Sequence, residues 1–145
     1  MSTVASILAE KSARIHAINP EASVLEATQK MNRHRIGSLI VMQGDNFVGI
    51  LSERDILMRV VAEEKEPRNV RVYDVMTTEV ICCPPETTLE EASAIMMSHR
   101  VRHLPVCDAE GRMVGLVSIG DLNARHASEQ EIVIHHLHEY IYGRV

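Results

Sequence analysis

Residues 49–55 read GILSERD and residues 115–121 read GLVSIGD. In both stretches a short apolar run ends in a serine, and an aspartate follows three residues after that serine. This pattern predicts a buried strand that leads directly into a helix. The first amides of such a helix, together with its dipole, favour a hydrogen-bond acceptor at the junction. Each stretch is therefore a candidate binding position as well as a signal of the fold.

The two stretches belong to a longer internal duplication. Residues 18–56 reappear as residues 83–122, with an offset of 65 that becomes 66 after a turn lengthened by one residue. The matches outside the junctions include Pro20 with Pro85, Glu26 with Glu91, Met31 with Met96, His34-Arg35 with His99-Arg100, and Leu39 with Leu104. A duplication of this size predicts two copies of one structural unit, related by a pseudo-twofold axis.

Each copy predicts the same order of elements. Ser23 and Thr88 each begin a capping box, so a helix should follow in both copies. Two strands should come next, separated by a turn rich in Gly, Asp and Asn; they are expected over residues 39–42 and 47–51, and over residues 104–107 and 113–117. Edge strands over 14–17 and 79–82 would precede the helices. The predicted fold class is α/β (α+β), with two β-α-β-β-α repeats.

The repeats set the expected domain boundaries. We place repeat 1 at residues 9–61, repeat 2 at residues 75–127, and a charged connector that contains Pro67 at residues 62–74. A short helix should precede repeat 1 over residues 2–8. A C-terminal helix is expected over residues 128–145, beginning with a capping box at Ser128. Its apolar face needs a cover, for which a partner subunit is one candidate.

Composition limits the classes of function. A formal net charge of −5 argues against non-specific nucleic-acid binding, which needs a basic face. The sequence shows no long apolar run and no leader pattern, so we expect a cytoplasmic protein with no membrane span. Three cysteines, two of them adjacent, suit a reducing compartment better than a disulfide framework. One Phe and no Trp predict an aliphatic core.

Several segments together resemble a known family. They are Asp74-Val75-Met76-Thr77, Arg102-His103-Leu104-Pro105-Val106 and the two Gly-x-x-Ser-x-x-Asp stretches. The chain resembles a tandem pair of cystathionine β-synthase (CBS) domains, also called a Bateman module, over roughly residues 7–125. The resemblance implies a regulatory module that senses an adenine nucleotide such as AMP, ADP, ATP or NADH. It also implies a homodimer, and we expect an unidentified regulated protein as a further partner.

The resemblance assigns residues to the nucleotide. In the family the aspartates receive the ribose and the serines lie near the ribose or phosphate, which points to Asp55 with Ser52 and Asp121 with Ser118. The adenine would lie between strands, against Arg14, Ile15, Ser38, Leu39 and Ile40 in one unit and Thr78, Val80, His103, Leu104 and Pro105 in the other. Arg102 and His103 would meet phosphates. The candidate set is completed by Arg54, Ile119 and Gly120, which lie inside the two junctions.

The residues themselves leave two interpretations of the junctions open. A carboxylate at a helix start can accept both ribose hydroxyls, each charge-assisted bond contributing roughly 1.5–3 kcal/mol. Ser-x-x-Asp is also an ordinary capping pair, worth about 1 kcal/mol without any ligand. Arg102 could be a solvated surface arginine and His103 a half-buried strand histidine. Because repeat 1 carries Gly37-Ser38 where repeat 2 carries Arg102-His103, we expect clefts of unequal affinity.

Other functions find less support in the sequence. Eight histidines include His135, His136 and His138 in the expected C-terminal helix, but no zinc-like spacing completes a site, so no metal is predicted. Cys82, Cys83 and Cys107 could form a redox sensor. No nucleophile elbow or phosphate loop is present, so we do not expect an enzyme. The remaining alternative is a constitutive dimeric scaffold with an empty cleft.

Overall fold

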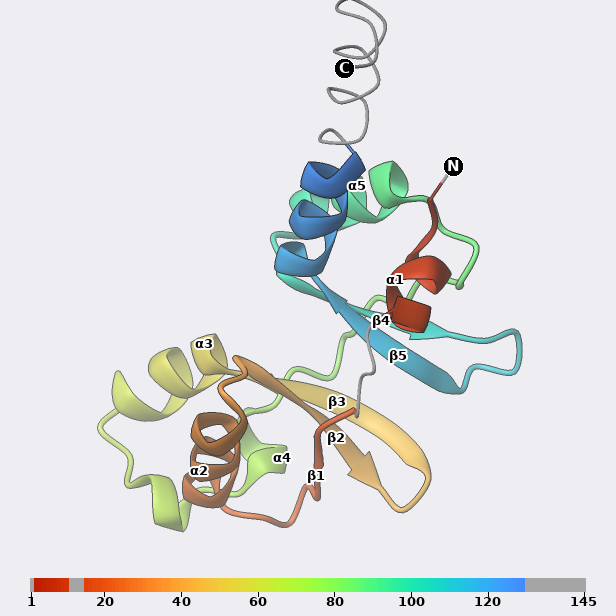
Figure 1. Ribbon diagram of the computed structural model, residues 1–145. Helices are drawn as coiled ribbons and strands as arrows, with labels where there is room; N and C mark the ends of the chain where they lie inside the picture. Colours follow the sequence, from red (N-terminus) through yellow and green to blue (C-terminus); the bar gives the residue numbers. More distant parts are fainter. Residues whose placement is uncertain (1, 11–14, 130–145) are drawn as a thin grey trace, which may run out of the picture. The chain divides into compact units, whose positions relative to one another are not determined.

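The computed structural model describes residues 2–10 and 15–129. Contacts within the chain divide it into two units (Figure 1). Arg14–Ile81 contains the first copy of the repeat and is called here the repeat-1 unit. Met1–Ala13 together with Cys82–Val145 contains the second copy and is called the repeat-2 unit. Each unit combines helices with a small sheet around its own hydrophobic core, which confirms the predicted mixed fold of two repeats.

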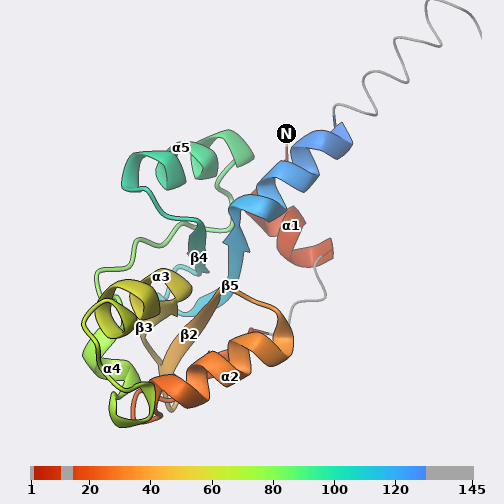
Figure 2. The same ribbon diagram turned by 90° about the vertical axis from the view of Figure 1, so that its left-hand side faces the viewer.

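The repeat-1 unit is built on a three-stranded sheet of order β1-β2-β3, formed by Ala17–Ile18, Ser38–Gln43 and Asn46–Ser52. β1 runs parallel to β2, and β3 pairs antiparallel with β2. Helix α2 (Val24–His34) packs on one face of the sheet (Figure 2). Its apolar positions recur at helical spacing, and they bury Val24, Ala27 and Met31 against Leu39, Val41 and Leu51.

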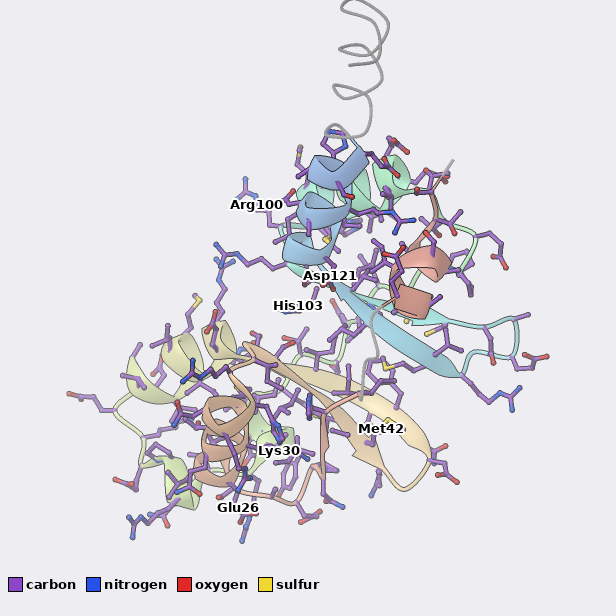
Figure 3. The ribbon with its side chains drawn as sticks, in the orientation of Figure 1. Glu26, Lys30, Met42, Arg100, His103 and Asp121 are labelled. Carbon is purple, nitrogen blue, oxygen red and sulfur yellow. The ribbon has the colours of Figure 1, made fainter. Side chains whose placement is uncertain are left out.

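Short helices complete the repeat-1 unit. β3 leads without a loop into α3 (Glu53–Ile56), and a stretch of π-helix over Leu57–Val61 (η1) continues it. A 3-10 turn, Pro67–Asn69 (η2), and α4 (Val72–Val75) follow. Lys30 of α2 ties the helix to the sheet, because its ammonium group donates to the carbonyl of Ala17 on β1 (Figure 3).

The repeat-2 unit has a two-stranded antiparallel sheet of β4 (His103–Cys107) and β5 (Met113–Ser118). Helix α5 (Leu89–His99) buries Leu89, Ala92 and Met96 in the core of this unit. Residues 119–129 are helical and follow β5 directly. Both sheets carry an irregular register at the same place, between Val41 and Met42 and between Val106 and Cys107. The duplication therefore extends to the details of strand pairing.

The predicted helix starts are confirmed, and both helices end in the same way. Ser23 Oγ accepts a hydrogen bond from the amide of Glu26 at 3.1 Å, and Thr88 forms a complete capping box with Glu91. At the other end, Arg35 and Arg100 adopt left-handed conformations with φ of 52° and 55°. These arginines occupy a position at which glycine is usual, because a Cβ atom is disfavoured there.

Each repeat receives the short helix that precedes the other repeat. Helix α1 (Val4–Glu10) buries Val4 and Ile7 in the core of the repeat-2 unit. Helix α4 buries Val72 and Val75 in the core of the repeat-1 unit. Matching backbone bridges support the exchange, since Thr3 pairs with Thr88 and Arg71 with Ser23. The end of the charged segment that we expected to be a connector therefore contributes core residues to the repeat-1 unit.

Three details differ from the expectations. The first strand is Ala17–Ile18, at the end of the predicted range 14–17, and Arg14 lies outside the described residues. The strand expected over 79–82 is wrong; only an isolated parallel bridge joins Cys83 to Val106. Pro84 and Pro85 follow at once and lack amide donors, which stops a ladder from extending. Ser128, expected to begin a new helix, lies inside the helical residues 119–129.

Candidate functional site

The strand-to-helix junction of repeat 1 is a closed hydrogen-bonded box. Ser52 is the N-cap of α3, and its Oγ accepts from the amide of Asp55 at 3.2 Å. In return Asp55 Oδ2 accepts from the amide of Ser52 at 2.9 Å and from its hydroxyl at 3.1 Å. Asp55 is only 8% exposed, so these bonds matter for keeping a charged group stable in a buried place.

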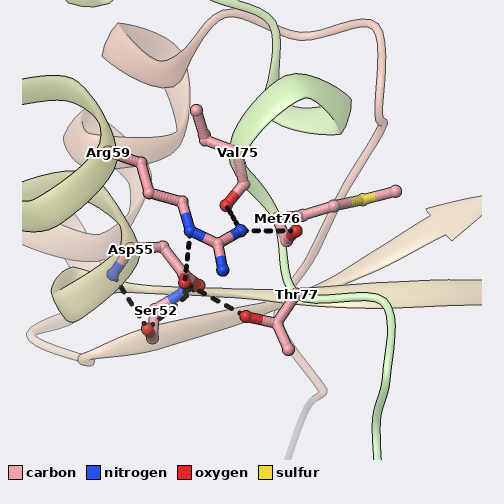
Figure 4. A network of polar contacts seen from close by, with 6 residues as sticks. All are labelled: Ser52, Asp55, Arg59, Val75, Met76 and Thr77. Carbon is pink, nitrogen blue, oxygen red and sulfur yellow. Dashed lines mark hydrogen bonds and ion pairs between the residues drawn. The ribbon is translucent and has the colours of Figure 1, made fainter. Parts of the chain in front are cut away.

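Two further residues reach the same carboxylate from other parts of the repeat-1 unit. The hydroxyl of Thr77 donates to Asp55 Oδ1 at 3.0 Å (Figure 4). The guanidinium of Arg59 lies 4.0 Å from the same oxygen. Arg59 also donates to the carbonyls of Val75 and Met76, at 3.1 and 3.2 Å. The carboxylate therefore joins the start of α3 to the residues just after α4.

The junction of repeat 2 has the same framework. The amide of Asp121 donates to Ser118 Oγ at 3.0 Å, and Asp121 Oδ2 accepts from the amide of Ser118 at 2.8 Å. His103 lies opposite Ser118 in the sheet, so His103 and Asp121 gather at one end of the β4–β5 pair (Figure 3). Asp121 is half-buried, whereas Asp55 is buried. A carboxylate held at a helix start is thus present twice, with different surroundings.

Strand alternation sorts the predicted apolar contacts into two groups. Leu39 and Leu104 are 0% and 1% exposed and belong to the hydrophobic cores of their units. The residues on either side of them point to the opposite face of each strand, since successive side chains alternate. That opposite face carries Ser38 and Ile40 on β2, and His103 and Pro105 on β4. Ser38 and Ile40 are themselves only 5% and 1% exposed and Pro105 is buried, so His103 is the one of these four that is partly exposed.

The backbone links each helix start to the beginning of the first long strand. The amide of Glu53 donates to the carbonyl of Gly37 at 2.9 Å, and the amide of Ile119 donates to the carbonyl of Arg102 at 2.8 Å. The charges at these equivalent places differ. A Cβ added to Gly37 would lie 3.3 Å from the carboxylate of Glu53, whereas repeat 2 has the exposed Arg102 beside the neutral Ile119. The repeat-1 junction thus carries charges of both signs, because Arg54 is exposed beside Glu53, whereas residues 119 and 120 of repeat 2 are uncharged.

The other predicted site residues lie as follows. Arg54, Ile119 and Gly120 are exposed in the first turns of their helices. Ile15 is 40% exposed, before β1. Thr78 is exposed and Val80 half-buried. Both belong to the repeat-1 unit with Asp55, although the sequence had grouped them with His103 and Pro105. Arg14 lies outside the described residues.

Sequence reasoning missed Thr77 and Arg59 as parts of the site. Arg59 follows Asp55 by four residues, and Arg125 follows Asp121 by four residues. This repeated spacing is typical of an ion pair on one helix face and could have been noticed. Arg125 forms ion pairs with Glu10 at the end of α1 and with Glu129. Thr77 carried no such signal, because it reaches Asp55 from 22 residues away.

Cys82 and Cys83 have environments that suppress thiolate formation. Partial burial raises the pKa of the Cys82 thiol to about 12, and a hydrogen bond with Cys107 adds to the effect. Burial also raises the pKa of Cys83. Because the thiolate is the reactive form, these surroundings favour unreactive thiols at neutral pH.

The described residues offer neither a cluster of metal ligands nor a membrane-spanning helix. Among residues 2–10 and 15–129, no group of three or more His, Cys, Asp and Glu side chains is placed to hold a metal ion. His135, His136 and His138 lie outside the described residues. Within the part of the chain that the structure covers, every helix is too short or too polar to span a bilayer.

Comparisons with known proteins agree with these features. The CBS domain family matches residues 4–62 and again residues 72–126. The CBS domain-containing protein YhcV of Bacillus subtilis is 32% identical over 117 residues, which are 81% of this chain and 82% of that protein. Three further curated relatives are longer, and the matched regions span 54–65% of their lengths.

Solved structures share the fold. A CBS-domain protein from Burkholderia ambifaria MC40-6 has a TM-score of 0.85 and 38% identity, and the match covers 89% of this chain and 96% of that chain. The CBS domain protein PAE2072 from Pyrobaculum aerophilum, solved in complex with AMP, has a TM-score of 0.73 and 22% identity over 83% of this chain and 89% of that chain. The repeated junction, the internal duplication and two separate family matches lead to one conclusion: the chain belongs to the CBS-domain family as a tandem pair of CBS domains.

Proposed function

We propose that this chain is a regulatory module that binds an adenine nucleotide (AMP, ADP, ATP or a dinucleotide such as NADH) and conveys its presence to a partner. Tandem CBS pairs are commonly regulatory and nucleotide-binding, which supports this class of function. The observation that carries the proposal is the doubled junction, where a carboxylate lies at a helix start beside the end of a strand. The AMP in PAE2072 is a property of that protein, with which this chain shares the fold.

The repeat-2 junction is the stronger candidate for nucleotide binding. Asp121 would accept the ribose hydroxyls, with Ser118 beside it, while Arg102 and His103 would face the phosphates. Arginine pairs well with phosphate, and its charge opposes that of the ligand. At the repeat-1 junction Glu53 lies beside Gly37, so a phosphate would meet a like charge there. We therefore expect occupancy of repeat 2 first.

To transmit the signal, the protein needs two conformations or subunit packings that bind the ligand with different affinities. In a homodimer, a nucleotide that favours one packing of subunits would shift the population toward that packing. The regulated partner would then read the packing of the dimer or the position of the C-terminal residues.

Two measurements test the proposal. Mass spectrometry of small molecules released from the purified, denatured protein should identify an adenine nucleotide. Thermal melts with AMP, ATP and NADH should show stabilisation, since a ligand at a hundred times its dissociation constant adds about 2.7 kcal/mol. Guanine nucleotides serve as the matched control. An unchanged melting temperature with every adenylate, together with no released nucleotide, rules the proposal out.

A constitutive dimeric scaffold is the second candidate, and an exposed apolar stripe favours it. Leu57, Met58 and Val61 of η1 are 60%, 57% and 57% exposed, close together on one side of the repeat-1 unit. Patches of this kind often mark protein contacts. Under this function, changing Leu57 and Val61 to serine should lower the molar mass measured by light scattering from dimer to monomer, and adenylates should have no effect on the dimer.

A further inference from the structure

The C-terminal end of α2 carries a cluster of basic side chains. Lys30, Arg33, His34 and Arg35 fall within six residues of one another, and residues 27–44 contain no acidic residue at all. Arg33, His34 and Arg35 are exposed, and Lys30 is half-buried. This cluster contrasts with the formal net charge of −5 on the whole chain. The four residues are called here the basic end of α2.

The helix and its cap do not require all of these basic residues. Cationic side chains in a last turn interact favourably with the helix dipole, which accounts for part of the cluster. Helix α5 is the matching helix of repeat 2, and it ends in the same left-handed cap, at Arg100. At the positions of Lys30 and Arg33, however, α5 carries Ile95 and Ser98. The two extra cations of α2 are therefore not needed to form or to end such a helix.

The two arginines of the basic end have no partner inside the protein. Among residues 2–10 and 15–129, no ion pair and no side-chain hydrogen bond involves the guanidinium of Arg33 or Arg35. By contrast, the guanidinium groups of Arg59, Arg71 and Arg125 contact carbonyls or carboxylates of their own chain. A guanidinium presents a planar fork of donors that matches the two oxygens of a carboxylate. The basic end thus offers two such forks to a ligand from outside.

The other two side chains of the basic end are held in place. His34 stacks on His16, with ring centroids 4.1 Å apart and an angle of 29° between the ring planes. The ammonium group of Lys30 donates to the carbonyl of Ala17, as the labelled side chain in Figure 3 helps to locate. An ammonium group has further N–H donors, and an imidazole offers a donor in each of its protonation states. Side chains that are already ordered lose less freedom when they bind a ligand.

We propose that the basic end of α2 is a docking surface for an acidic segment of a partner protein. Arginine forms paired hydrogen bonds with carboxylates, and several carboxylates along one segment would complement cations that recur along one end of a helix. A nucleic acid fits less well, because its binding depends on many phosphate contacts and the net charge of −5 repels a long polyanion. The inference does not rest on the proposed nucleotide site, since docking of this kind needs no nucleotide.

The inference is tested by NMR titration of a peptide of alternating glutamate and serine into the isotope-labelled full chain, without nucleotide. The amide signals of residues 30–35 should shift until they saturate, and the affinity should fall with added salt, because exposed charges are screened. Combining Arg33→Gln with Arg35→Gln should weaken binding about fivefold. Arg68→Gln removes an exposed arginine of η2 and is the matched control, which should leave the affinity unchanged.

Thermal melts and a second polymer complete the test. The double variant should melt as the unchanged protein does, because neither arginine has an internal partner. A peptide of alternating lysine and serine should not shift the signals of residues 30–35. The inference is overturned if the glutamate peptide leaves these signals unshifted, or if the double variant binds it as tightly as Arg68→Gln does. Tighter binding of a poly-thymidine oligonucleotide at residues 30–35 also overturns it, since the surface would then belong to a nucleic acid.

Discussion

At the end of β3, the carboxylate of Asp55 accepts hydrogen bonds from Ser52 and Thr77 and is buried. At the end of β5, the carboxylate of Asp121 accepts a hydrogen bond from the amide of Ser118 and is half-buried. His103 lies at the start of the neighbouring strand β4, and Arg102 is the residue before that strand. The same backbone thus supports a buried junction whose carboxylate also binds Thr77, and a half-buried junction with the exposed Arg102 nearby. The capping geometry is the same in both repeats, while the side chains around it differ; we propose that the nucleotide binds first at the repeat-2 junction.

Replacing each aspartate by alanine should break this comparison most clearly. Asp55→Ala removes the capping box and leaves Thr77 without its acceptor, so we expect a loss of about 2–3 kcal/mol in the free energy of unfolding. Asp121→Ala should cost about 1 kcal/mol of stability but lower AMP affinity about ten- to hundredfold. Chemical denaturation and calorimetry measure the two quantities. Equal losses of stability with unchanged affinity would assign both residues to capping alone.

The glycines before the junctions provide the next test. A Cβ on Gly49 would lie 2.7 Å from the backbone oxygen of Thr77, whereas a Cβ on Gly115 would lie 2.6 Å from the flexible end of Leu8. A side-chain end can move and a hydrogen-bonded backbone cannot. Gly49→Ala should therefore lose about 2 kcal/mol and Gly115→Ala under about 1 kcal/mol, by chemical denaturation. A larger loss for Gly115→Ala would contradict this difference between the repeats.

Replacing Arg102 tests whether a positive charge at the repeat-2 junction contributes to phosphate binding. Arg102→Ala should weaken binding of AMP and ATP about five- to tenfold and leave adenosine binding unchanged, because the guanidinium would contact only phosphate. The loss should shrink in high salt, where exposed charges are screened. Arg68→Ala, at an exposed arginine of η2 outside the candidate site, is the matched control and should leave binding unchanged. Titrations at two salt concentrations measure the effect, and an equal loss for adenosine would remove Arg102 from the phosphate site.

The smallest effect should be the same in both repeats. Arg35 and Arg100 have left-handed backbones, so Arg35→Gly and Arg100→Gly should each stabilise the protein by about 0.5–1 kcal/mol. Arg33→Gly, inside α2, is the control and should destabilise by about 1 kcal/mol. Denaturant melts measure all three. Destabilisation by Arg100→Gly alone would indicate that the arginine side chain contributes contacts in repeat 2 that repeat 1 lacks.

The local elements could be predicted from the sequence because their signals are local. The capping residues Ser23 and Thr88, the strand patterns and the Ser-x-x-Asp junctions each lie within a few neighbouring residues, and the structure has helices and strands at those places. The Thr77–Asp55 bond could not be predicted, since a hydroxyl 22 residues away leaves no periodic trace.

Contacts between residues far apart in the sequence were likewise missed, because they leave no local pattern. Val70 and Val72 are buried, but they lie in a charged segment whose overall composition suggested a solvated linker. The alternation of apolar and polar residues around Val70 and Val72 spans too few positions to predict a buried segment against that charged composition. The burial of α1 against the second repeat likewise depends on partners about eighty positions later in the sequence, as the Thr3–Thr88 bridge shows.

The exchange of short helices sets an order for folding during synthesis. Helix α1 is made before repeat 1, but its apolar residues Val4 and Ile7 pack in a core that includes Leu122, which is made only with repeat 2. The repeat-1 unit, in contrast, is complete once Ile81 has been made. Domains made first generally fold first. Helix α1 must therefore wait for its core partners while the repeat-1 unit folds, and it becomes buried only after the residues up to Leu122 have been made.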